Sequence, residues 1–214
     1  MSKDAPWLKH YGDVPKSIEY PDCSMVEAVL KTAKIHPELT AYSFFGRKRS
    51  YRDFASDIER AARAFKALGI NPGERVMIYL PNIPQALECI YAVNLIGAIA
   101  VMVHPLSSEG ETAFFIKSSK CRAVVALDQF YGKFAAISSE VRPEFLILTS
   151  VKDALSPVKR IGYALTEGRK VEKAPQSAPV IFWKDFLRGG NAATDPREDR
   201  APHDCAIILY SGGT

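Results

Sequence analysis

A run of four small residues is the part of this sequence best suited to hold a phosphate group: Ser211, Gly212, Gly213 and Thr214. Glycines let backbone N–H groups approach a ligand closely, and the two hydroxyls add further donors. An apolar run at 207–209, followed by Tyr210, predicts a buried strand just before them. Ligands in open α/β sheets bind at the carboxyl ends of strands. A phosphate site and a plain surface turn are therefore evenly balanced interpretations.

Three common motifs for nucleotide binding or nucleophilic catalysis are absent from the sequence. There is no G-x-x-x-x-G-K-[ST], no G-x-G-x-x-G and no G-x-S-x-G. His104 is the one histidine expected at a strand's carboxyl end, where a structural role beside Pro105 is favoured over ligand contact. No set of ligands has metal-binding spacing. We therefore assign no catalytic residue and no metal ligand within these 214 residues.

The position of the glycine turn bears on how complete the sequence is. A natural chain rarely ends inside such a turn directly after a core strand. We therefore expect these 214 residues to be the front part of a longer protein, whose phosphate loop would continue beyond Thr214.

Composition is that of an ordinary soluble globular protein, with 47% hydrophobic and 24% charged residues. The net charge of +4 is too weak to imply nucleic acid binding. The N-terminus is polar, so we expect no secretory signal. No C-x-x-C pair occurs, so we expect reduced thiols in a cytoplasmic protein at all four cysteines: Cys23, Cys89, Cys121 and Cys205.

The longest apolar stretch, residues 86–103, contains Glu88, Asn94 and Gly97. It predicts a helix followed by a strand and not a membrane span. Strands and helices alternate in this way from residue 51 to 149, which indicates βαβ units. The expected fold class is α/β, with a mainly parallel sheet flanked by helices on both faces. The expected strands of this sheet are 75–80, 99–103, 123–127, 145–149, 180–182 and 205–210.

Helix starts and one hairpin are also predicted. Ser24, Ser50 and Ser108 each stand three residues before an acidic residue and are candidate N-caps. Residues 40–45 and 49–51 predict a hairpin with its turn at 46–48.

Two segments lack a regular pattern. Residues 1–22 are rich in Pro, Tyr and Trp and predict an extended arm lying on the body of residues 23–214. Residues 151–178 carry six Lys or Arg against three acidic residues. A solvated excursion is favoured there over a membrane- or nucleotide-facing role, with one or two helical turns around 161–165.

Five short motifs, in this order, give the chain a resemblance to the adenylate-forming (AMP-binding, acyl-CoA synthetase) superfamily. Residues 49–54 are similar to its T-Y-x-E-L segment, with Ser, Asp and Phe replacing Thr, Glu and Leu. The remaining matches are residues 68–76, Leu80-Pro81-Asn82, residues 94–106, and 209–214 at the start of its Y-[ST]-[SG]-G-[ST]-T-G-x-P-K-G phosphate loop. The arm and the Tyr-Ser-Gly-Gly-Thr spelling resemble bacterial long-chain fatty acid–CoA ligases most.

The resemblance implies an N-terminal α/β subdomain of a fatty acid–CoA ligase. Such an enzyme makes an acyl-adenylate from ATP and a carboxylate and then transfers the acyl group to CoA, using Mg²⁺. In this sequence, Ser211, Gly212, Gly213 and Thr214 would be the first half of its ATP phosphate loop. The rest of the loop, the Mg²⁺-binding acid and the C-terminal domain have no counterpart here. We therefore expect the 214 residues alone to be inactive and to bind no cofactor tightly.

Several alternatives stay open. The acid could be aromatic, short-chain or an amino acid, or the chain could be a non-catalytic binding module with the same fold. The expected partners are fatty acid, ATP and CoA, with no nucleic acid and at most a weak peripheral membrane contact through the basic residues 152–173. The oligomeric state is left open.

Overall fold

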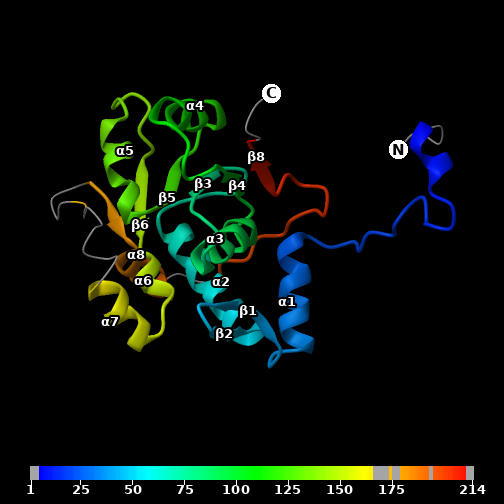
Figure 1. Cartoon of the computed structure of the whole chain (residues 1–214). Helices are drawn as coiled ribbons and strands as arrows, with labels where there is room; N and C mark the ends of the chain where they lie inside the picture. Colours follow the sequence, from blue (N-terminus) through cyan, green and yellow to red (C-terminus); the bar gives the residue numbers. More distant parts are fainter. Residues whose placement is uncertain (1–4, 166–173, 175–178, 193–194, 211–214) are drawn as a thin grey trace.

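The computed structural model describes residues 5–165, 174, 179–192 and 195–210. Its centre is a six-stranded sheet in the order β7-β6-β5-β3-β4-β8 (Figure 1). Every neighbouring pair in this sheet is parallel. The strands are β3 (Arg75–Tyr79), β4 (Ile99–Met102), β5 (Ala123–Leu127), β6 (Phe145–Thr149), β7 (Ile181–Phe182) and β8 (Ile207–Leu209). The predicted α/β class is confirmed.

Helices cover both faces of this sheet, which makes three layers (Figure 1). Alternate residues of β3 point to opposite faces, as the two-residue period of a strand requires. Val76 and Ile78 join a core with α2 (Tyr51–Ala67), α3 (Pro84–Leu95) and α8 (Trp183–Gly189). Met77 and Tyr79 join a second core with α4 (Glu109–Ser119) and α5 (Tyr131–Ala136). The central strands are therefore apolar on both faces.

The three predicted serine caps are confirmed. The Ser24 and Glu27 side chains each accept a hydrogen bond from the other residue's backbone N–H at the start of α1 (Met25–Ile35). Ser108 does the same with Glu111 at α4. Ser50 accepts from the Asp53 N–H at 3.1 Å and starts α2. These caps satisfy amide donors that a helix start leaves without partners.

The predicted hairpin forms, but its turn lies one residue earlier than expected. Strand β1 (Thr40–Phe44) pairs antiparallel with β2 (Arg47–Ser50), and Phe44 lies opposite Arg47. The turn is therefore Phe45–Gly46, and both residues have positive φ, 47° and 79°. That geometry is a two-residue type I′ turn, whose twist suits a hairpin. The sequence suggested a longer turn because phenylalanine is an unusual residue for a left-handed position.

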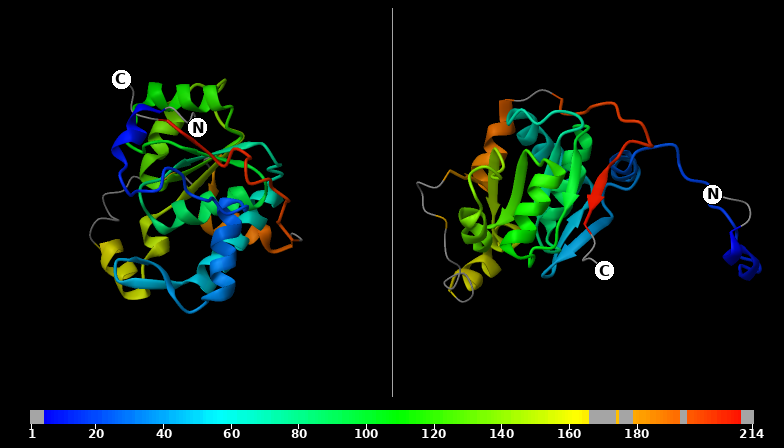
Figure 2. Two further views of the ribbon diagram at one scale, coloured as in Figure 1. Left: turned by 90° about the vertical axis from the view of Figure 1, so that its right-hand side faces the viewer. Right: turned by 90° about the horizontal axis from the view of Figure 1, so that it is seen from above.

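Residues 5–22 do not lie on the body as expected (Figure 1). From residue 5 onward they include a short 3-10 turn, η1 (Pro6–His10), with no buried residue. The described arm leads away from α1 (Figures 1 and 2). Its Trp7, Ile18 and Tyr20 side chains are exposed. The arm thus contributes little to the core described above.

The basic segment contains two helices in its described part, α6 (Val151–Ala154) and α7 (Pro157–Leu165). The apolar stretch at 86–103 is divided between α3 and β4, as predicted. Among the described residues, no helix is both long and apolar enough to cross a bilayer.

Candidate functional site

The four residues predicted to hold phosphate, Ser211, Gly212, Gly213 and Thr214, lie outside the described residues. The strand that leads to them is described. Ala100, Val101 and Met102 of β4 pair in parallel with Ile207, Ile208 and Leu209 of β8. Strand β8 therefore delivers the chain to the carboxyl edge of the sheet. Ligands bind at that edge in open α/β folds.

Tyr210 is fixed at the point where the predicted loop begins. Its backbone N–H donates to the Met102 carbonyl at 3.4 Å. Its ring packs against Phe115 of α4, with centroids 4.3 Å apart. Its hydroxyl lies 2.6 Å from the Ser118 hydroxyl on the same helix. Helix α4 thus holds the residue just before the glycine turn.

A second set of contacts clamps the turn after β4. The Tyr79 hydroxyl, at the end of β3, donates to the Ser107 carbonyl at 3.1 Å. The Lys133 ammonium donates to the same carbonyl at 2.7 Å and lies 5.5 Å from the centre of the Phe130 ring. His104 accepts a hydrogen bond from the Leu106 N–H at 3.3 Å through Nδ1. That contact agrees with the structural role favoured for His104.

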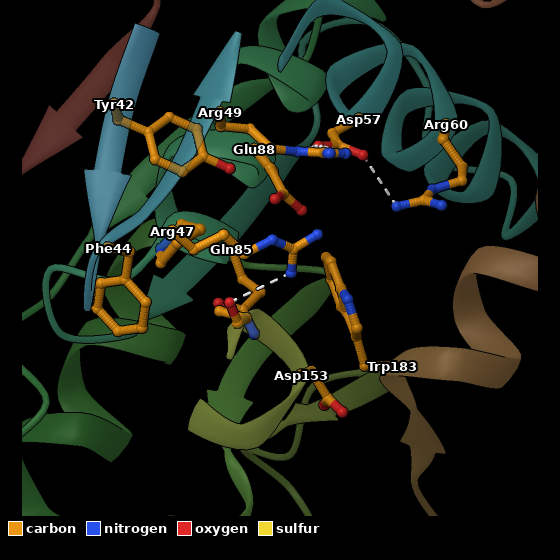
Figure 3. Close-up of a pocket in the computed structure, with 12 residues that line it drawn as sticks. Tyr42, Phe44, Arg47, Arg49, Asp57, Arg60, Gln85, Glu88, Asp153 and Trp183 are labelled. Atoms are coloured by element: carbon orange, nitrogen blue, oxygen red, sulfur yellow. Dashed lines mark hydrogen bonds and ion pairs between the residues drawn. The ribbon is translucent and has the colours of Figure 1, made fainter. Parts of the chain in front are cut away.

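A separate polar pocket lies beside α3 (Figure 3). Its volume is about 80 Å³, enough for water or a small ion and too small for a nucleotide. Parts of its wall follow the carboxyl ends of β3, β6 and β7, and the hairpin and α2 complete it. The polar ends of Arg47, Arg60 and Glu88 point towards the same hollow.

Asp57 is the centre of an ion-pair network in this pocket. Arg49 donates to its Oδ2 from Nε at 2.8 Å and from Nη2 at 2.6 Å. Arg60 donates to its Oδ1 at 3.0 Å. The Asp57 side chain is only 6% exposed. Buried carboxylates are normally paired in this way, because an unpaired buried charge is costly.

Glu88 lies in the same pocket on α3 and is 8% exposed. Burial raises the pKa of its carboxyl from 4.5 to about 7, and the negative charge of Asp57 adds to the effect. Arg60 and Arg49 oppose the rise in pKa. Burial, assisted by Glu88 and Asp57, also raises the pKa of Tyr42. The pocket therefore holds a carboxyl group, that of Glu88, whose pKa lies near neutral pH.

Gln85 closes the floor of the pocket. Its amide Nε2 donates to Thr149 Oγ1 and to the Ser150 carbonyl, both at 3.1 Å. Its Oε1 is buried and has no hydrogen-bond partner in the described part of the chain. A water or small donor in the hollow would satisfy it.

Sequence reasoning missed this pocket and the Tyr79–Lys133 clamp. The available signal was Glu88, a carboxylate inside a mainly apolar helix, which was used only to argue against a membrane span. Its partners on α2 and the hairpin are distant in sequence. Within the described residues, no three His, Cys, Asp or Glu side chains gather to hold a metal ion. All four cysteines are free thiols.

Comparison with known proteins assigns the family. The family described as AMP-binding enzyme matches residues 29–214. The chain belongs to the AMP-binding enzyme family. The resemblance of the five short motifs is thereby confirmed, and the sheet that ends in β8 belongs to the N-terminal α/β part of the adenylate-forming fold.

Individual relatives of this AMP-binding chain cover more than one substrate class. A long-chain-fatty-acid–CoA ligase of Bacillus subtilis (strain 168) is 29% identical over 100% of this chain and 39% of the relative. An acetyl-coenzyme A synthetase of Streptomyces avermitilis is 30% identical over 84% of this chain and 27% of that protein. The crystal structure of a long-chain-fatty-acid-CoA ligase from Archaeoglobus fulgidus superposes with a TM-score of 0.67 at 18% identity. The superposed region covers 92% of this chain and 36% of the Archaeoglobus fulgidus chain. The chain therefore spans about two fifths of the length of its long-chain relative.

Proposed function

We propose that this chain is the N-terminal part of an acid–thiol ligase that activates a long-chain fatty acid. ATP and the acid would give an acyl-adenylate and pyrophosphate, and the thiol of CoA would then displace AMP. The observation that carries the proposal is that β8 ends at the carboxyl edge of the sheet and that Tyr210, which precedes residues 211–214 in the sequence, is fixed on α4. The match to the Bacillus subtilis ligase, over all of this chain and 39% of the relative, supports the fatty acid as substrate.

The part of this chemistry that falls to the chain is phosphate binding. As the carboxylate oxygen attacks the α-phosphorus, the bond to the pyrophosphate oxygen breaks and negative charge leaves with pyrophosphate. Backbone N–H groups and hydroxyls at Ser211, Gly212, Gly213 and Thr214 would donate to those oxygens. Among the described residues, no cluster of His, Cys, Asp or Glu side chains could hold the Mg²⁺ ion.

The 214 residues are proposed to be inactive by themselves. They contain no match to the lysine-bearing end of the loop or to the other ligase motifs beyond it, and those groups supply most of the rate. Exchange of labelled pyrophosphate into ATP should be at background for this chain and fast for the Bacillus subtilis ligase in parallel. Exchange by the chain at a comparable rate would contradict the proposal.

Reading the gene past codon 214 tests the ligase assignment most cheaply. A continuation as Thr-Gly-x-Pro-Lys-Gly supports it, whereas a stop codon there supports a binding module without chemistry. If the frame continues, acid-dependent pyrophosphate exchange of the whole product should be fastest with a long-chain fatty acid among palmitate, acetate, benzoate and an amino acid. The acetyl-coenzyme A synthetase relative keeps the short-chain alternative in that panel. The cytoplasmic location, the fatty acid, ATP and CoA as partners, and the absence of nucleic acid binding stay predictions.

A further inference from the structure

Helix α7 presents a stripe of large apolar side chains to solvent. Val158, Ile161 and Leu165 are 80%, 65% and 57% exposed. Their spacing of three and then four residues places them on one side of the helix. A helix with such a stripe normally buries it, so the exposed stripe points to a partner surface.

The tip of the β1–β2 hairpin extends this apolar surface. Phe45 is 62% exposed. Its backbone carbonyl accepts a hydrogen bond from the Lys159 ammonium of α7, and Arg47 reaches the Ala154 carbonyl at 3.4 Å. The hairpin and the α6–α7 pair accordingly lie side by side (Figure 2). We call Phe45, Val158, Ile161 and Leu165 the α7 patch.

Cations surround the α7 patch. Residues 45–48 and 151–165 carry five basic residues and one acidic residue. The acidic one, Asp153, caps the start of α6, where its carboxylate accepts a hydrogen bond from the Ser150 N–H at 3.1 Å. The five basic residues are all exposed: Arg47, Lys48, Lys152, Lys159 and Arg160. An apolar stripe with basic flanks is the pattern of a helix that lies in the interface of an anionic membrane.

We propose that the α7 patch is a peripheral binding surface for a bilayer that contains anionic phospholipid. The four apolar side chains enter the boundary between headgroups and acyl chains. Lys48, Lys152, Lys159 and Arg160 pair with lipid phosphates, whereas the Arg47 guanidinium faces the pocket beside α3. A second copy of the chain fits this surface less well, because two such faces would bring like charges together. The inference needs no ligase chemistry, so it stands or fails separately from the proposed function.

Vesicle sedimentation of the 214-residue chain tests this inference. Vesicles of phosphatidylcholine, alone or mixed with phosphatidylglycerol, serve as the probe. We expect sedimentation with the anionic vesicles only, and much less of it at about 0.5 M salt. Ile161→Asp should lower the partition coefficient at least about tenfold, because an apolar contact is lost and a like charge is added. Ile35→Asp is the matched control, since Ile35 is also helical and 58% exposed but lies on α1.

Two further measurements make the result decisive. Circular dichroism and thermal unfolding of both variants identify any loss of fold. The charge-reversing pair Lys48→Glu with Lys152→Glu repeats the test and leaves the apolar stripe and the Lys159 contact with the hairpin in place. No binding to anionic vesicles, or binding that Ile161→Asp and Ile35→Asp reduce equally, overturns the proposal. Self-association of the wild type that Ile161→Asp abolishes would assign the patch to a second copy and also overturn it.

Discussion

Glu88 couples the stability of the fold to pH. Its folded-state pKa of about 7 lies above its usual 4.5, so the folded chain binds this proton more tightly than the unfolded chain. The free energy of unfolding should therefore fall as pH rises from about 4.5 to about 7, by up to roughly 3 kcal/mol. Glu88→Gln should remove this slope and be more stable than the wild type at pH 8. Urea denaturation at pH 5 and pH 8 measures it.

Glu109→Gln is the matched control for that experiment, because Glu109 is exposed on α4. It should follow the wild type at both pH values. A Glu88→Gln variant with an unchanged pH slope would show that the Glu88 carboxyl is not held in its buried, protonated form.

Asp57 should be the most sensitive carboxylate in the pocket. Asp57→Ala leaves Arg49 and Arg60 without their shared partner, and Arg49 is only 25% exposed. We expect a loss of about 2–4 kcal/mol in the free energy of unfolding. Asp185→Ala breaks an exposed pair with Arg188 and should cost less than about 0.5 kcal/mol. Equal losses in the two variants would contradict the network described for Asp57.

The packing of α8 against α2 depends on a glycine at its end. A Cβ on Gly190 would lie 2.5 Å from the Ala64 backbone nitrogen and 2.8 Å from its Cα, so the backbones would have to move apart. Gly190→Ala should therefore lower the unfolding free energy by about 1–3 kcal/mol. Gly189→Ala is the neighbouring control, because its Cβ would meet no atom within 4 Å. Thermal melts of both variants test this prediction. Equal unfolding midpoints would contradict the close approach of Gly190 to the Ala64 backbone.

Elements with a strong local signal could be predicted from the sequence. The serine caps of α1, α2 and α4 were found, because each cap depends on residues only three positions apart. The strands β3 to β6 were found, because a strand buried on both faces reads as a continuous apolar run. The hairpin turn was misplaced, because the left-handed conformation of Phe45 has no local sequence signal.

The candidate sites also differ in whether a local sequence signal could reveal them. Residues 211–214 are predicted from a local pattern and stay a prediction, whereas the Asp57–Glu88 pocket joins α2, α3 and the hairpin through tertiary packing alone. The clamp on Ser107 likewise combines β3 and α5. The hydrophobic periodicity of a segment and its helix caps do not reveal tertiary contacts between segments that are distant in sequence.

The whole molecule should tolerate removal of its arm. Residues 5–22 include none of the buried hydrophobic core residues, and η1 has no buried residue. Deleting residues 1–20 retains the Ser24 cap and should change the free energy of unfolding by less than about 1 kcal/mol. Urea titration of the shortened chain checks this, with deletion to residue 30 as the control that removes the first half of α1. A large loss from the shorter deletion would mean that the arm packs on the body after all.

The edge position of β8 has a kinetic consequence. Within the described sheet, β8 has three residues and pairs on one side only, with β4, a strand that precedes it by about a hundred residues. The chain must close that long loop before the pairing forms, so β8 should join the sheet after the β3–β4–β5 centre has folded. By the same reasoning, it should open first under native conditions. Its amide hydrogens should exchange with solvent well before those of β5, and each opening would release the start of the predicted phosphate loop.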